Sequence, residues 1–121
     1  MCRFQEIFDA YGADYKATMG RFLNNETMYL KFLDMMFKDE NMDKLGNALE
    51  AGDYEEAFAA GHTLKGVTGN MGLTPLYDAV CAIVEPLRTH QTERDYGGLY
   101  RVIREEYEKA DAFRAKLREG R

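Results

Sequence analysis

Apolar side chains recur at intervals of three and four residues along most of this chain, a spacing typical of helices that pack on one side. β-branched residues are sparse and do not alternate with polar ones, so there is almost no strand signal. The clearest helical stretch, LYRVIREEYEKADAFRAKLREG, ends the chain and places six side chains in register: Leu99, Ile103, Tyr107, Ala110, Phe113 and Leu117. The periodicity predicts an all-α fold.

The N-terminal part of the pattern predicts two short helices followed by a longer one. The short helices are expected in FQEIFDAY and DYKATMGRFL, and the longer one in NNETMYLKFLDMMFKD. Asn24 or Asn25 is suited to cap the longer helix, because an amide oxygen can accept from the free N–H groups of a first turn. The face expected to meet the core comprises Met28, Phe32, Met35 and Met36, with Tyr29 and Leu33 beside them.

Two residues in the middle of the chain mark a boundary between helices. Gly52 is expected to end the helix in MDKLGNALEAGD. Asp53, followed by Glu56, has the form of a capping box and is expected to open a helix that continues to about Met71. This second helix contains the least ordinary part of the sequence, GHTLKGVTGNMG at positions 61–72.

The remaining pattern completes a bundle. Thr74 and Pro75 are expected to act as a cap and as the first helical residue, and Pro86 is expected to kink or end the helix they open. Residues 88–98 are the most loop-like segment. The helix that Thr74 and Pro75 open carries a stripe of core side chains: Leu76, Val80, Ile83, Val84 and Leu87. Three or four longer helices joined by short turns predict an antiparallel four-helix bundle with additional short N-terminal helices, forming one domain over residues 1–121.

Composition excludes several classes of function. The net charge is −5 without a basic tract, which argues against nucleic acid as a partner. No apolar run approaches the roughly 20 residues of a membrane span, and the first residues lack the features of a signal peptide. Cys2 and Cys81 are far apart and suggest neither a metal site nor a disulfide framework. We therefore expect a cytoplasmic monomer without a metal or other cofactor.

A helical wheel divides the stretch from residue 53 to residue 71 into two unlike faces. One face gathers the side chains expected in the core: Ala57, Ala60, Leu64, Val67, Thr68 and Met71. The opposite face carries His62, Lys65, Gly66 and Gly69, at positions i, i+3, i+4 and i+7, with Phe58 at its edge. Histidine, lysine and two glycines are thus expected to form one outward stripe.

The glycines of this stretch are costly in a helix. Each interior glycine loses about 1 kcal/mol relative to alanine, so Gly61, Gly66 and Gly69 together would cost on the order of 2–3 kcal/mol. Gly61, nearer the buried side, is expected to allow a neighbouring helix to approach closely. Gly66 and Gly69 lie on the polar side, where we expect no neighbour from the same chain. Their missing side chains are better explained by a partner that arrives from outside.

The chemistry of the stripe fits a phosphoryl group. A neutral imidazole has a free ring nitrogen that can act as a nucleophile. Lys65, one turn away, can bring a cation to a phosphoryl oxygen. The stripe includes no second carboxylate, metal cluster or phosphate-binding loop. It can hold a phosphoryl group, but the groups that activate one are expected from a partner.

The residues His62-Thr63-Leu64-Lys65-Gly66, continuing to Asn70-Met71-Gly72-Leu73, resemble the signature of histidine phosphotransfer (HPt) domains of multistep two-component relays. The preceding residues 48–66, ALEAGDYEEAFAAGHTLKG, are similar to the usual run-in of that family. The resemblance implies a four-helix bundle whose exposed histidine accepts phosphate on its outer ring nitrogen. It implies a phosphocarrier rather than an enzyme.

The resemblance also implies partners and residue roles. The donor would be an aspartyl phosphate on the receiver domain of a response regulator or hybrid kinase, the acceptor another receiver aspartate, and the magnesium would belong to the receiver. His62 would be the phosphorylation site and Lys65 its charge partner. Gly66 would give steric clearance, which Gly69 would extend. Phe58 would either contact the partner or pack on its own bundle.

One departure from the family pattern concerns the histidine ring. Some members place a polar side chain on the following helix to hydrogen-bond the inner ring nitrogen, whereas positions 82–84 here are alanine, isoleucine and valine. Two other functions remain as alternatives: a module that binds receivers without accepting phosphate, and an enzyme that uses His62 as a general base. The other histidine, His90, is expected to be an ordinary surface residue.

Overall fold

The computed structural model describes residues 3–119, and every regular element in that range is an α-helix, which confirms the predicted fold class. The helices are α1 (Arg3–Tyr11), α2 (Tyr15–Gly20), α3 (Glu26–Phe37), α4 (Asn41–Ala51), α5 (Tyr54–Asn70), α6 (Thr74–Arg88) and α7 (Tyr96–Glu119). No helix in this range is long and apolar enough to span a bilayer.

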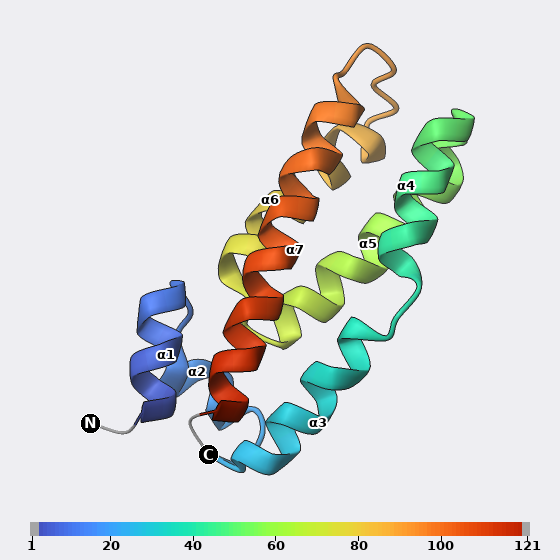
Figure 1. Cartoon of the computed structure of the whole chain (residues 1–121). Coiled ribbons are helices and arrows are strands. Elements are labelled where there is room, and N and C mark those ends of the chain that lie inside the picture. The colour runs from blue at the N-terminus through green and yellow to red at the C-terminus, as the bar shows by residue number, and fades with distance from the viewer. Residues whose placement is uncertain (1–2, 120–121) are drawn as a thin grey trace.

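The helices form an antiparallel four-helix bundle whose first rod is divided. Figure 1 shows α3 and α4 following one another along one side, after which α5, α6 and α7 alternate in direction. Helix α5 packs against both α4 and α6, and α6 packs against α7. Helix α7 also contacts α3 and α4, which completes the bundle. The short helices α1 and α2 lie at one end, with α1 packed on α7.

Local signals fix most helix ends as expected. The side chain of Asn25 accepts a hydrogen bond from the Met28 N–H at 3.0 Å and caps α3. Asp53 caps α5 in the same way, and Gly52 ends α4 in the left-handed conformation with φ 71°. The expectation for Thr74 is wrong, since α6 begins at this residue itself and no side chain caps that helix. The same helix continues past Pro86 and ends at Arg88.

The inward face of α3 differs from the expected one. Phe32 and Met35, expected in the core, are 42% and 54% exposed, whereas Tyr29, Leu30 and Leu33 are buried together with Met36. The cause is the aromatic cluster at the end of the bundle, in which the Tyr29 ring meets three others: Phe4, Phe8 and Phe22. Because this cluster draws Tyr29 inward, the face carrying Phe32 and Met35 turns towards solvent.

Helices α2 and α3 also contact the C-terminal end of α5. The buried hydroxyl of Tyr29 donates to the Met71 carbonyl at 2.9 Å, and burial raises the pKa of this tyrosine well above its usual value. Gly72 has a φ of 71°, and a Cβ atom there would overlap the Thr18 hydroxyl on α2. Glycine therefore suits this exit from α5, where both the positive φ and the close approach of Thr18 disfavour a side chain.

Candidate functional site

His62 points outward from the middle of α5. The imidazole is exposed, while the buried residues of the same helix lie on its other side: Ala57, Ala60, Gly61, Leu64 and Thr68. Of the other four residues predicted for the site, Gly66 is exposed and Phe58, Lys65 and Gly69 are half-buried. The helix therefore presents the predicted stripe, here called the His62 face, at the surface of the bundle.

The ring of Phe58 lies against the imidazole. The two ring centroids are 5.6 Å apart and the planes meet at 24°, so the rings are stacked across one turn of α5. Phe58 itself packs against the core. No described residue hydrogen-bonds the imidazole, and Ile83 and Val84 of α6 are buried away from it. Among the described residues, the stacked ring of Phe58 is the aromatic contact available to orient the imidazole.

Replacing Phe58 by leucine should slow any reaction of His62 by about two- to tenfold, because aromatic pairs contribute about 0.5–1.5 kcal/mol beyond their buried area. Phe58→Tyr keeps a ring and is the matched control. The proton resonances of the His62 ring should move in Phe58→Leu, where the ring current is lost, and stay near their wild-type positions in Phe58→Tyr. Unchanged resonances in both variants would contradict the orienting role.

Lys65 supplies an unpaired cation. Its ammonium forms no ion pair with any residue in the range 3–119. It lies one turn beyond His62 and lines the same hollow of the surface as His62 and Gly66. No carboxylate of residues 3–119 is paired with this ammonium, so its positive charge is available to an anion that binds beside His62.

The three glycines of α5 have different surroundings. A Cβ atom on Gly66 would meet nothing within 4 Å, as expected for a position left open to a partner. A Cβ on Gly61 would lie 3.1 Å from Val84, which agrees with the close helix approach predicted there. The expectation that Gly69 has no neighbour in the chain is wrong, because a Cβ there would lie 3.0 Å from the Tyr77 ring.

Two hollows flank His62 and share Gly66 and Asn70. The apolar hollow has a volume of about 780 Å³ and lies between α3 and α5; its lining includes Phe22, Phe32, Met35, Met36, Val67 and Met71. The basic hollow has a volume of about 420 Å³ and is lined by Arg21, Lys65, Gly69 and Tyr77 besides the shared residues. The His62 face thus has an apolar side and a cationic side.

Arg21 is the main residue of this region that the sequence pattern did not single out. It follows α2, and its Nη1 donates to the carbonyls of Gly69 at 3.2 Å and Asn70 at 2.9 Å. These carbonyls belong to the end of α5, where the helix dipole is negative and a cation is favourable. Tyr77 was also missed; a hydrogen bond with the Cys81 side chain raises its pKa. No local motif links either residue to His62.

The fold and this face define a helical bundle with an exposed histidine on its surface. A family model described as Hpt domain matches residues 28–113, most of the chain, and the chain therefore belongs to the Hpt domain family. Members of this family are phosphocarriers of two-component phosphorelays and interact with receiver domains. A search of curated proteins and a search of solved structures found no match.

Proposed function

We propose that this chain is a phosphotransfer protein in which His62 accepts a phosphoryl group from a receiver aspartate and passes it to another receiver. In this proposal residues 1–121 act as one domain and as a cytoplasmic monomer. The observation that carries the proposal is the arrangement on α5, where an exposed imidazole lies one turn before Lys65, whose ammonium has no ion-pair partner among residues 3–119, and before the open space above Gly66.

The proposed step needs little from this chain beyond the nucleophile. The lone pair of the outer ring nitrogen attacks phosphorus, the bond from phosphorus to the aspartyl oxygen breaks, and the released carboxylate keeps its electron pair. The ammonium of Lys65 offsets negative charge on the phosphoryl oxygens. The proposal assigns the magnesium and its acidic ligands to the receiver. The described residues contain no group of three His, Cys, Asp or Glu side chains able to hold a metal ion.

The apolar hollow supports docking of a receiver beside His62. Phe32 and Met35 on its wall are large apolar side chains that are 42% and 54% exposed. Exposed apolar side chains grouped on one side of a small domain are typical of a protein-binding surface. We infer that an apolar face of the receiver covers this hollow while its aspartate meets His62.

The direct test is incubation with phosphorylated receiver domains. The chain should acquire a phosphoryl group that is labile in acid and stable in alkali, and the labelled protein should then phosphorylate a fresh receiver. Receiver binding without any labelling would contradict the proposal and favour a docking module. Turnover of a small molecule that depends on His62 would favour an enzyme instead.

Replacing Lys65 by glutamine should slow phosphotransfer by roughly 10- to 100-fold, since a hydrogen bond to a charged group contributes about 1.5–3 kcal/mol. Receiver binding should change less than the rate. Lys65→Arg keeps the charge and should recover part of the rate, while Lys44→Gln, which removes an exposed lysine of α4, should transfer normally. Equal rates in Lys65→Gln and Lys44→Gln would show that the ammonium has no special role.

A further inference from the structure

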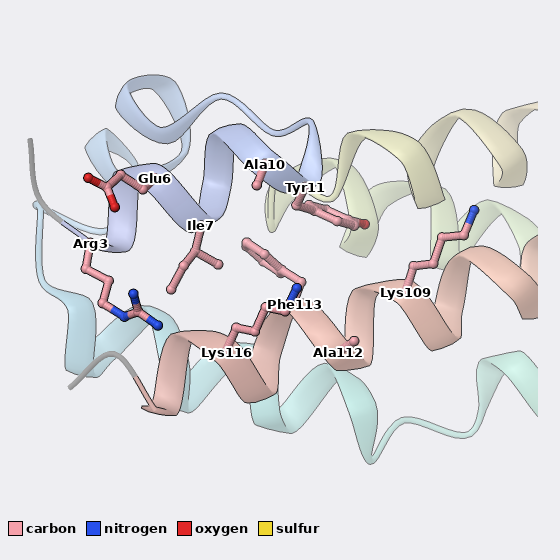
Figure 2. A pocket seen from close by; sticks show the side chains of 9 residues that line it. All are labelled: Arg3, Glu6, Ile7, Ala10, Tyr11, Lys109, Ala112, Phe113 and Lys116. Atoms are coloured by element: carbon pink, nitrogen blue, oxygen red, sulfur yellow. The ribbon is translucent and has the colours of Figure 1, made fainter.

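A third depression of the surface lies between α1 and the C-terminal half of α7 and shares no residue with the two hollows at His62 (Figure 2). Its volume is about 390 Å³, within the usual range of small-molecule sites. We call it the α1–α7 groove. Its floor is apolar, because the buried ring of Phe113 stacks on Tyr11 at 4.4 Å and Ile7 packs beside them.

Two alanines keep the α1–α7 groove open. Ala10 on α1 and Ala112 on α7 both line it and are exposed. Each contributes only a methyl group, whereas a larger side chain at either position would fill the space between the helices. Figure 2 shows this space between the two helices, bounded by the side chains of both.

The rim of the α1–α7 groove is cationic in a chain of net charge −5. Arg3, Lys109 and Lys116 line it against one carboxylate, Glu6. Lys109 has a partner in Glu106 at 3.2 Å. Arg3 and Lys116 form no ion pair with any residue between 3 and 119.

The dipole of α1 does not favour the positive charge of Arg3 at the start of that helix, because the positive end of the dipole lies there. In Figure 2 Arg3 lies at one end of the groove, and Lys116 extends from α7 towards Phe113. Two cations without an ion-pair partner among residues 3–119, next to an apolar floor, are complementary to a ligand with an anionic head and an apolar body.

We propose that the α1–α7 groove binds a small amphipathic carboxylate of the medium-chain fatty acid class. The chain of the ligand lies on Ile7 and Phe113, and its carboxylate meets the cations of the rim, Lys116 and Arg3. Family membership does not account for this groove, because α1 precedes the matched residues 28–113 and Lys116 follows them. The inference is therefore independent of the phosphotransfer proposal.

The test is a titration of the isotope-labelled chain followed by amide chemical shifts. Sodium octanoate should shift residues of α1 and of the second half of α7, with a dissociation constant on the order of 1 mM for a ligand of this size. Two ligands of the same chain length are the controls. Uncharged 1-octanol should bind about tenfold more weakly, and octylammonium should cause no shifts at the groove.

Variants separate the two halves of the site. Lys116→Gln should weaken octanoate about threefold or more, while Lys31→Gln, at an exposed lysine of α3, should have no effect. Ala112→Leu should fill the groove and abolish binding, while Ala115→Leu, on the exposed side of the same helix, should not.

Equal binding of octanoate and 1-octanol, or shifts outside the groove, would overturn the proposal. Shifts at the groove caused by a receiver and not by octanoate would overturn it too and assign the groove to a protein partner.

Discussion

His62→Gln is expected to reduce labelling by a phosphorylated receiver to background while the fold and the binding of the receiver remain intact. Glutamine removes the nucleophilic ring nitrogen but remains polar and of similar length. The imidazole is exposed and forms no hydrogen bond with a described residue, so its loss removes the stacking on Phe58 and should lower the free energy of unfolding by at most about 0.5–1.5 kcal/mol. The measurement is acid-labile phosphate on the chain after incubation with the labelled receiver.

The second histidine of the chain provides a matched control. His90 lies in the loop between α6 and α7, is exposed, and lines neither of the hollows beside His62. His90→Gln should therefore be labelled like the wild type. Label that survives in His62→Gln, or that disappears in His90→Gln, would show that another residue accepts the phosphoryl group. A wild-type chain that binds receivers as tightly as His62→Gln and is not labelled either would be a docking module.

The outward position of His62 could be predicted from the sequence because it depends on one helix. Once Asp53 and Gly52 set the start of α5, the helical repeat alone places His62 and Gly66 opposite Ala57 and Leu64. No contact distant in sequence is needed for this result. The same is true of the all-α fold, which the spacing of apolar residues indicates in most segments.

The parts that could not be predicted depend on contacts between segments distant in sequence. Helix α3 is apolar over much of its circumference, so its own sequence does not decide whether Tyr29 or Phe32 turns inward. The aromatic cluster formed with α1 decides it. In the same way, Gly69 seemed free on a wheel of one helix, but the Tyr77 ring arrives from α6. Arg21 reaches the end of α5 across 48 residues of sequence.

Gly66→Leu is expected to stabilise the chain while slowing phosphotransfer by about 100-fold or more. Glycine in a helix interior costs about 1 kcal/mol relative to a good helix former, and a Cβ atom at position 66 would meet nothing within 4 Å. The free energy of unfolding should therefore rise by up to about 1 kcal/mol. The same open space borders both hollows at His62, so a leucine would hold the receiver aspartate away from the ring, and a misplacement of about 1 Å can cost on the order of 100-fold.

Gly66→Ala separates the two effects, because alanine gives the full gain in helix propensity with a single methyl group. Both variants should melt above the wild type in thermal unfolding, but alanine should keep much of the transfer rate that leucine loses. Receiver binding should weaken together with the rate in Gly66→Leu, because the leucine occupies the space that the partner needs. If both variants lost transfer equally, the glycine would act through backbone flexibility. If Gly66→Leu transferred at the wild-type rate, the receiver would approach His62 from another side, and the open space above Gly66 would have no part in docking.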